Sequence, residues 1–458
     1  MSDNRQKALD YAHANNAKFR ADLDELLKIK SISTDPEHKG DVMTAAEWCA
    51  DKLRGYGFEN VKVYETATQP SVLGEYMGAG EDAPTLLVYG HFDVQPVDPL
   101  DLWDTDPFEP TEKDGRLYAR GASDMKGQVI ATTAAIESAL AAGELPVNIK
   151  FYMEGEEEVG SHSMKAFLEE HHQKLTADFV LNPDGGILGP EQPTIVYALR
   201  GLAYFQLDIQ GPAMDLHSGI YGGVLRNPAN ELARLIAGMH DENGRVTLPG
   251  FYADVLELSD EERANLAKLP QTDDFYREQT GQKEMTGEAG YSSVERATAR
   301  PTLDVNGLLS GWTGAGSKTV LPAKAMAKIS SRLVANQDPA KIAEGLRQYV
   351  KDNIAPGMQW EVTELAHSSP SITPTDSEVV AAMQQALETV WDKPVLFRRE
   401  GGTVPVSGYL KDFLGIDSVV GGFGLPEDRL HSPNESLHLA TWTRGIDAFI
   451  HFLYNLSA

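Results

Sequence analysis

The chain has 458 residues, of which 41% are hydrophobic and 24% are charged, which is typical of a globular protein rather than a disordered or fibrous one. Its 40 lysines and arginines are outnumbered by 68 aspartates and glutamates, so the formal net charge is −28. This acidity argues against nonspecific binding to nucleic acid or anionic lipid, because both need a basic surface. At ~150 residues per domain, the length predicts two or three folding units.

The only cysteine, Cys49, cannot close an intrachain disulfide, which favours a cytoplasmic location. The first thirty residues are polar and lack the apolar core of a secretory signal. No stretch approaches the ~18 consecutive apolar residues of a membrane span. Because Cys49 shares a helical face with Val42, Ala45 and Leu53, we expect it to pack in a core and not to act as a catalytic thiol.

The N-terminal part of the chain alternates between helix-like and strand-like segments. Apolar residues recur at helical spacing from about residue 5 to 28, which predicts an amphipathic covering helix. An Ala-rich segment at about 126–142 predicts a second helix, and apolar runs predict strands at 85–89, 147–153 and 177–181. Strands separated by helices are typical of a parallel or mixed sheet with helices on both faces.

The pattern changes after Arg200. Apolar and polar residues alternate at 202–210, 325–334 and 360–362, which predicts strands with one solvent-facing side. Asn227-Pro228 and Asp338-Pro339 each combine a capping residue with a proline at the first helical position, so each predicts the start of a helix. These elements indicate a small α+β unit that differs from the preceding part.

A Ser- and Pro-rich segment at 368–374 predicts a linker. After it the chain again alternates helix with strand, with expected elements at 376–391, 418–420 and 441–456. The sequence therefore predicts an α/β fold. Its discontinuous domain, 1–196 and 372–458, has a central mixed sheet, and an α+β domain at 197–371 is inserted into it.

Histidines and carboxylates follow the ends of the predicted strands. His91 and Asp93 follow the first strand, Glu157 and Glu158 follow the second, and the third is followed by Asp184. Another carboxylate, Asp124, lies just before the Ala-rich helix. Because ligands of open α/β sheets bind at the carboxyl ends of strands, we expect these groups to converge. Imidazole and carboxylate ligands without thiolate suit zinc, manganese or cobalt, and one aspartate can bridge two ions.

Five motifs extend this pattern over most of the chain. They are GHFDVQP at 90–96, LYARGASDMKG at 117–127, EGEEEVGS at 154–161, DLHSG at 215–219 and HSPNE at 431–435. Together they make the chain resemble the M20 family of metallopeptidases, in the branch of cytosolic dipeptidases and carnosinases. The resemblance implies that the discontinuous domain is catalytic and that the inserted one is a lid and dimerisation domain of a homodimer.

The resemblance also implies two divalent metal ions per chain, Zn²⁺ or alternatively Mn²⁺ or Co²⁺, bridged by Asp124. One ion would be completed by His91 and Asp184, and the other by Glu158 and His431. The general base of the family is the first of two adjacent glutamates, and the second is a ligand. Here three occur in a row, and the flanking glycines make Glu157 the base and Glu158 the ligand, whereas Glu156 occupies a variable place. Asp93 resembles the carboxylate that orients the imidazole of His91.

The implied reaction is the hydrolysis of dipeptides or short peptides with a free C-terminus. Two divalent cations lower the pKa of a bound water molecule, and Glu157 removes a proton from it. The resulting hydroxide attacks the peptide carbonyl. His217 could by itself be any exposed histidine, but the resemblance implies that it crosses a dimer interface and stabilises the oxyanion. Arg332 could be a solvated charge, but by resemblance it pairs with the substrate carboxylate. Thr319 and Thr403 match further substrate contacts, although Thr403 replaces a serine common in relatives.

Other functions suit parts of the same pattern. An N-acyl amino acid deacylase, a carboxypeptidase or a desuccinylase could use the same scaffold. A catalytically silent metal-binding or scaffolding protein is the alternative from another class, and the complete set of base and ligands argues against it. The expected partners are a small peptide substrate and a second copy of the chain, with no nucleic acid and no membrane. A cis peptide bond between Asp124 and Met125 is a further implication of the resemblance.

Overall fold

The computed structural model describes every residue except 1, 144, 403–404, 417 and 457–458. It contains two compact units. The first unit comprises Met1–Tyr197, Thr373–Arg398 and Pro405–Ala458, and the second comprises Ala198–Ile372 with a short segment that begins at Arg399. Among the described residues, no helix is long and apolar enough to cross a membrane.

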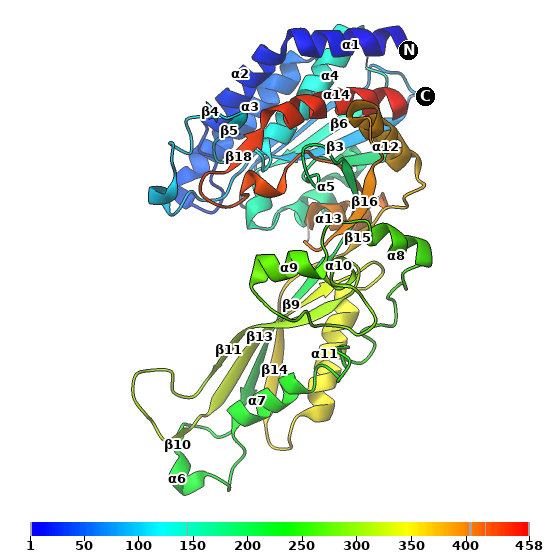
Figure 1. Cartoon of the computed structure of the whole chain (residues 1–458). Coiled ribbons are helices and arrows are strands. Elements are labelled where there is room, and N and C mark those ends of the chain that lie inside the picture. Colours follow the sequence, from blue (N-terminus) through cyan, green and yellow to red (C-terminus); the bar gives the residue numbers. More distant parts are fainter. Residues whose placement is uncertain (1, 144, 403–404, 417, 457–458) are drawn as a thin grey trace. The chain divides into compact units, whose positions relative to one another are not determined.

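A mixed sheet forms the centre of the first unit (Figure 1). Its order is β1-β2-β6-β3-β7-β17-β8, in which β3 is parallel to both β6 and β7, and β17 is parallel to β7. β1, β2 and β8 pair antiparallel with their neighbours, and β16 also pairs with β8. The strands are β1 Glu59–Tyr64, β2 Ser71–Tyr76, β3 Thr85–His91, β6 Asn148–Glu154, β7 Phe179–Asn182, β8 Thr194–Leu199, β16 Leu396–Glu400 and β17 Ser418–Val420.

Helices cover both faces of this sheet, and Figure 1 shows α1, α4 and α14 on one side of β3 and α5 and α13 on the other. α4 packs against α1, α2 and α14, and its residues are buried from Lys126 to Ala139, which explains why its sequence shows no polar stripe. The helices are α1 Ser2–Ala14, α2 Asn16–Leu27, α3 Lys39–Gly55, α4 Lys126–Ala141, α5 Met164–Leu175, α12 Glu378–Trp391, α13 Pro405–Leu414 and α14 Leu439–Leu456. A small sheet, β18-β5-β4, joins Ser436–His438, Arg116–Tyr118 and Thr111–Lys113.

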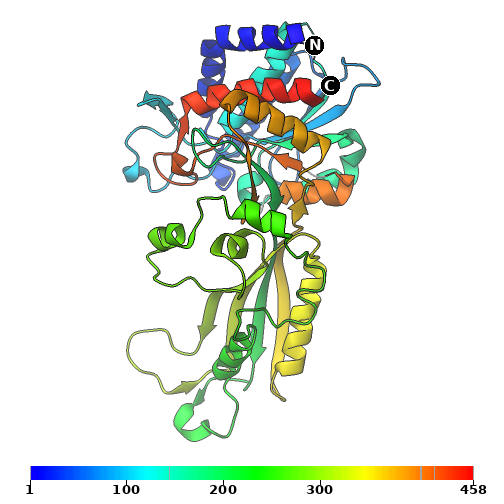
Figure 2. The same cartoon turned by 45° about the vertical axis from the view of Figure 1, so that its right-hand side comes forward.

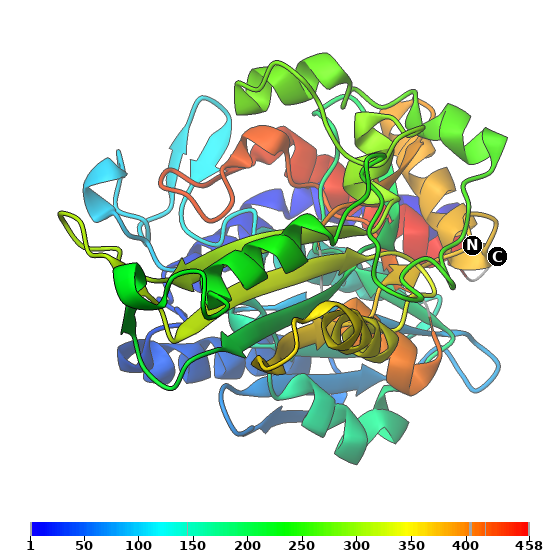
Figure 3. The same cartoon turned by 90° about the horizontal axis from the view of Figure 1, so that it is seen from below.

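The second unit is built on an antiparallel sheet in the order β11-β13-β9-β14. Burial alternates strictly along β9 and β13, so one face forms a core and the other faces solvent. Helices α7 and α11 lie on the core face, as Figures 2 and 3 show. The bounds are β9 Gly201–Gln210, β11 Thr302–Ser310, β13 Lys324–Leu333, β14 Gln359–Ser368, α7 Pro228–Ala237 and α11 Pro339–Asn353.

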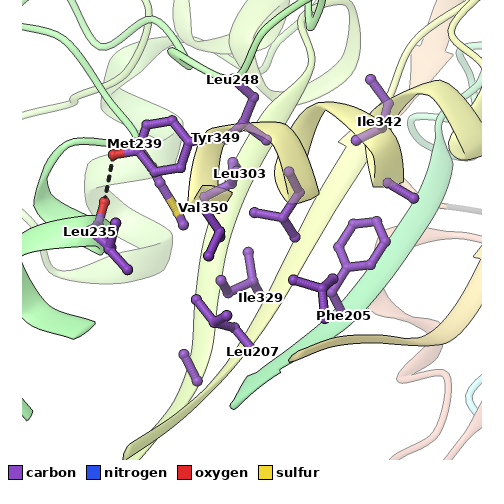
Figure 4. Packing of buried hydrophobic residues seen from close by; sticks show 14 of the residues in the cluster. Phe205, Leu207, Leu235, Met239, Leu248, Leu303, Ile329, Ile342, Tyr349 and Val350 are labelled. Carbon is purple, nitrogen blue, oxygen red and sulfur yellow. Dashed lines mark hydrogen bonds between the residues drawn. The ribbon is translucent and has the colours of Figure 1, made fainter. Parts of the chain in front are cut away.

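The core of the second unit is shown in Figure 4. Phe205, Leu207 and Ile329 from the sheet pack against side chains of both helices, among them Leu235 and Tyr349. The hydroxyl of Tyr349 donates a hydrogen bond of 2.8 Å to the carbonyl oxygen of Leu235, which ties α11 to α7 and satisfies a buried polar group. At one end of this sheet, β10 (Leu216–His217) pairs with β12 (Val320–Leu321), and α6 (Ser218–Tyr221) follows β10. Three further helices, α8 Asp260–Leu266, α9 Asp273–Thr280 and α10 Ser293–Thr298, belong to this unit.

The structure confirms the α/β class with its mixed sheet, and two local predictions differ from it. The helix expected from about residue 5 to 28 is two helices that break at Asn15, whose backbone angles are not helical. The segment expected to be a linker contains strand β15 (Ser371–Ile372), which pairs with the end of β8. Strands β1, β2, β4, β5, β8, β11, β16 and β18 were not predicted. The Asp124–Met125 peptide bond is cis, as the motif resemblance implied.

Candidate active site

The predicted ligands lie where strands of the first unit end. His91 is the last residue of β3, and Asp184 follows two residues after β7. Glu157 and Glu158 open a short 3-10 turn, Glu157–Val159, shortly after β6. Because β3, β6 and β7 are neighbouring parallel strands, their carboxyl ends bring these side chains to one edge of the sheet.

The first group of ligand atoms comes from His91, Asp124 and Asp184, which each offer one atom within 4.8 Å of the others. Nε2 of His91 lies 3.2 Å from Oδ1 of Asp124 and 4.0 Å from Oδ2 of Asp184. The imidazole of His91 is fully buried, and the backbone N–H of Asp184 donates to Asn182 at 2.9 Å. The three donor atoms therefore lie close enough together to hold one metal ion.

A second group comes from Asp124, Glu158 and His431. Nε2 of His431 lies 2.9 Å from Oδ2 of Asp124 and 3.2 Å from an oxygen of Glu158. Asp124 therefore turns one carboxylate oxygen toward each group. Two imidazoles and three carboxylates are a donor set that suits zinc, manganese or cobalt, and a carboxylate shared between the groups suits a pair of ions.

Asp93 connects the two sides of the site. Its carboxylate lies 3.3 Å from Nδ1 of His91, on the side of the ring opposite the nitrogen that faces Asp124. The same carboxylate accepts the backbone N–H groups of Glu157, at 3.3 Å, and Glu158, at 3.1 Å. One fully buried aspartate thus orients an imidazole and fixes the turn that carries both glutamates.

The three consecutive glutamates have different surroundings. Glu156 is buried, and it accepts hydrogen bonds from the hydroxyl of Thr68 and from the backbone N–H of Ser163, away from the ligand groups. Glu158 contributes to the second group. Burial raises the pKa of Glu157 well above its ordinary value; the charge of His91 opposes this shift and that of Asp184 adds to it. Glu157 therefore lies close to the ligand groups without belonging to either.

Burial and close charges shift the pKa values of the predicted ligands. Burial raises the pKa of Asp184 to about 7, and the charge of Asp124 acts in the same direction. Hydrogen bonds to Asp124 and Glu158 raise the pKa of His431 to about 10. Burial opposes protonation of His91, but its hydrogen bonds to two aspartates hold its pKa well above the ordinary value. Such ligands bind metal in their deprotonated forms, so a divalent cation would displace these protons.

Two residues without a predicted role form hydrogen bonds to the predicted ligands. The amide nitrogen of Gln95 donates to a carboxylate oxygen of Glu158 at 2.8 Å and to the Glu158 carbonyl at 3.1 Å. Glu435 accepts the backbone N–H of Asp124 at 3.1 Å. Gln95 lies two residues beyond Asp93, and that spacing was a signal; Glu435 is separated from Asp124 by 311 positions, and no local pattern connects them.

The predicted substrate-binding residues of the second unit lie in two places. His217 and Thr319 are exposed and adjacent, because His217 pairs with Val320 and the N–H of Ser218 donates to the Thr319 carbonyl at 3.0 Å. Arg332 lies on the solvent-facing side of β13, where it lines a cavity of about 760 Å³. Thr403 lies outside the described residues.

This fold and this donor set are those of a metal-dependent hydrolase, and comparison with known proteins gives the family. A profile of peptidase family M20/M25/M40 matches residues 87–455. The chain belongs to this family, and it is an enzyme of the M20 metallopeptidase type.

Several characterised proteins are similar over their whole length. The Cys-Gly metallodipeptidase DUG1 of Candida albicans is 30% identical, with 95% of this chain and 94% of the relative covered. The human Beta-Ala-His dipeptidase is 28% identical, with 99% and 92% covered. The crystal structure of the M20 family metallo-carboxypeptidase Sso-CP2 from Sulfolobus solfataricus matches with a TM-score of 0.84 and 34% identity, and covers 96% of this chain and 99% of that one.

Proposed function

We propose that the protein is a dinuclear metal-dependent dipeptidase that cleaves dipeptides or short peptides with a free C-terminus. The observation that carries this proposal is the position of Asp124, whose two carboxylate oxygens face different imidazoles, 3.2 Å from His91 and 2.9 Å from His431. A carboxylate shared in this way suits two ions held side by side.

In this proposal, the ligands of one ion are His91, Asp124 and Asp184, and those of the other are Asp124, Glu158 and His431. Zn²⁺ is the proposed metal, and Mn²⁺ or Co²⁺ also suit the donors. When bound, the two ions supply Lewis-acid polarisation of the scissile carbonyl and lower the pKa of a water molecule.

The residues of the chain then perform the proton transfers. Glu157 is the proposed general base because it lies beside the ligand groups and is held at its backbone by Asp93. It takes a proton from the attacking water and returns a proton to the leaving amine. Asp93 keeps the imidazole of His91 in the orientation in which Nε2 faces the centre.

Substrate contacts are assigned to the second unit. We propose that Arg332 pairs with the C-terminal carboxylate of the substrate and that His217 stabilises the oxyanion, with Thr319 and Thr403 as further contacts. His217 and Thr319 belong to the end of the sheet at Lys324, because Asp215 accepts the N–H of Ala323. Figure 1 shows β10 and α6 beyond this end of the strands.

The spacing of these residues supports a homodimer. Arg332 lies eight residues along β13 from Lys324, which is roughly 26 Å of extended strand. A dipeptide spans only ~7 Å, so His217 and Arg332 of one second unit are too far apart to bind the same dipeptide. We therefore propose that His217 and Thr319 act in the active site of a second copy.

Exposed apolar side chains near His217 support the same arrangement. Ile220 on α6 and Val224 just after it are large hydrophobic residues with exposed side chains. Leu308 and Leu309 near the end of β11, and Trp312 just after it, are exposed as well. Ile220 is 66% exposed and Val224 is 75% exposed. Exposed apolar groups of this kind mark surfaces that associate with a partner, and a second copy is the occupant that also explains the position of His217.

We propose that residues 1–196 and 372–458 form the catalytic domain and that 197–371 form the lid and dimerisation domain. Closure of a lid excludes water and brings substrate contacts to the centre. A cytoplasmic location is proposed from cysteine usage, because Cys49 is free and buried. The acidic composition favours a small peptide over nucleic acid or membrane as the partner.

A carboxypeptidase is the second candidate, because the similar structure of Sso-CP2 is described as a metallo-carboxypeptidase. An N-acyl amino acid deacylase or a desuccinylase would use the same groups. The test compares initial rates on dipeptides, tripeptides, longer peptides and N-acyl amino acids at equal concentration. We expect the highest kcat/KM on dipeptides. Preference for longer peptides would favour the carboxypeptidase, and turnover of acyl substrates alone would rule out the dipeptidase.

A further inference from the structure

Glu435 is a buried carboxylate, 1% exposed, that lies four residues after His431 and directly before β18. Each of its two oxygens accepts two hydrogen bonds from a single loop. The donors are Nη1 of Arg120 at 2.8 Å and the N–H of Gly121 at 3.0 Å on one oxygen, and the N–H groups of Ser123 and Asp124, both at 3.1 Å, on the other.

The loop that Glu435 binds is the one that carries Asp124. This loop lies between β5 and α4 and is part of neither, so its buried N–H groups must find acceptors outside a regular ladder. A carboxylate that accepts several backbone N–H groups fixes the path of a loop, and charge-assisted bonds of this kind are stronger than neutral ones. Glu435 therefore fixes the backbone of Asp124, and the orientation of the Asp124 side chain depends on that backbone.

The segment that carries His431 is bound to the same loop at two points. Before His431, Asp428 accepts the hydroxyl of Ser123 at 2.6 Å. After it, Glu435 binds the backbone of Asp124. His431 thus lies between two anchors that are both attached to the Asp124 loop, and its Nε2 lies 2.9 Å from Oδ2 of Asp124.

We infer that Glu435 is a positioning residue that holds the carboxylate of Asp124 and the imidazole of His431 at the separation needed to share one metal ion. It touches neither substrate nor metal, and it acts through the loop backbone. This inference rests on the proposed metal centre, and it adds a residue to which no ligand, base or substrate role is assigned.

A glutamine at position 435 tests this role with almost no change in volume. Both oxygens of Glu435 accept two donors each, so the amide NH₂ of a glutamine must face two N–H donors whichever way it is turned. The variant E435Q should lose bonds to one side of the loop and leave buried donors without an acceptor. E435D keeps the charge opposite Arg120 but shortens the side chain, so it should lie between E435Q and wild type.

The control is a glutamate with similar burial that belongs to the other unit. Glu288 of the second unit is 5% exposed and accepts two hydrogen bonds of 2.8 Å from Arg300. E288Q should lower the melting temperature as E435Q does, because both break a buried pair. Only E435Q should change metal binding.

The experiment uses the full chain freed of metal and titrated with Zn²⁺ by calorimetry and with Co²⁺ by visible absorption. We expect E435Q to lose roughly 10–100-fold in metal affinity and to change the Co²⁺ spectrum, with E435D intermediate and E288Q like wild type. If E435Q does not fold, E435D carries the test alone. Wild-type affinity and an unchanged spectrum in a folded Glu435 variant would overturn the inference. Failure of the wild type to bind two ions would instead overturn the proposed function.

Discussion

Nε2 of His431 lies 2.9 Å from Oδ2 of Asp124, although the two residues are 307 positions apart. His91 approaches the other oxygen of the same carboxylate at 3.2 Å. The chain therefore folds so that its N-terminal and C-terminal parts meet at one aspartate, and the proposed metal centre depends on this contact.

The assignment of the general base predicts a separation of turnover from metal binding. E157Q keeps the size of the side chain but cannot accept the proton of water, so dipeptide turnover should fall by ~10²–10⁴-fold. The variant should still bind two ions, because Glu157 belongs to neither ligand group. Steady-state rates and metal analysis of the purified protein measure both.

The matched control is E156Q, because Glu156 is hydrogen-bonded to Thr68 and Ser163 and belongs to neither ligand group. It should keep turnover within several-fold of wild type. Retained activity in E157Q would move the base to Glu156 or Glu158.

The register of the three glutamates shows what the sequence could and could not supply. His91, Asp93, Glu158 and Asp184 could be placed together because each lies at or shortly after the end of a strand, and neighbouring parallel strands end at one edge of the sheet. The sequence could not show that Glu156 forms its hydrogen bonds with Thr68 and Ser163, because neither of these residues belongs to a recognisable pattern.

Contacts between distant loops were also beyond the sequence. Glu435 binds the backbone of Asp124, 311 positions away, through a hydrogen bond that forms only when the loops are folded. Among the elements, helices such as α4 and α14 and the buried strands β3, β6 and β7 were predictable from periodicity and apolar runs, whereas the buried strands β2 and β8 were not. The break at Asn15 was not predictable either, because Asn15 makes no side-chain capping hydrogen bond, and strand β15 is defined only by its pairing with the distant end of β8.

The proposed action of His217 in a second copy predicts complementation between two inactive variants. In a dimer of H217A with E157Q, one site has its own Glu157 and receives His217 from the partner, so it should be active. If subunits exchange freely in an equal mixture of the two variants, activity should reach about a quarter of the wild-type value. Half of the dimers then contain one subunit of each variant, and each of these dimers has one complete site out of two.

Refolding the two variants together and assaying the mixture is the measurement. Each variant refolded alone is the control and should stay inactive. A mixture no more active than its components would contradict transfer of His217 between copies.

The proposed role of Arg332 predicts an effect that depends on the C-terminus of the substrate. R332K keeps the positive charge but loses the planar, bidentate donor, so KM for a free-carboxyl dipeptide should rise roughly 10-fold or more. The same dipeptide with a C-terminal amide should be hydrolysed slowly and equally by both proteins. An equal change in KM on both substrates would argue against a carboxylate contact.

Glu231 predicts a pH-dependent contribution to the stability of the second unit. Its carboxylate accepts hydrogen bonds from Arg234 at 2.6 Å and from the N–H of Ala355 at 2.7 Å, and the bond from Arg234 lowers its pKa below the ordinary 4.5. A lowered folded-state pKa stabilises the fold above the unfolded value, and this contribution is lost as the pH falls through the folded-state pKa.

E231Q should therefore be less stable than wild type at pH 7, and the difference should shrink below about pH 4. Urea denaturation of both proteins between pH 3 and pH 7 measures the two curves. A difference that stays constant over this range would exclude an electrostatic origin.

The most direct test of the dinuclear dipeptidase is a metal titration that is followed by activity. The chain freed of metal is mixed with increasing Zn²⁺, and dipeptide hydrolysis and bound metal are measured in the same samples. We predict no hydrolysis without metal and a rise that saturates at two ions per chain, because His91 with Asp184 and His431 with Glu158 lie on opposite sides of Asp124. Full hydrolysis without metal, or two bound ions with no hydrolysis of any dipeptide, would contradict the proposal.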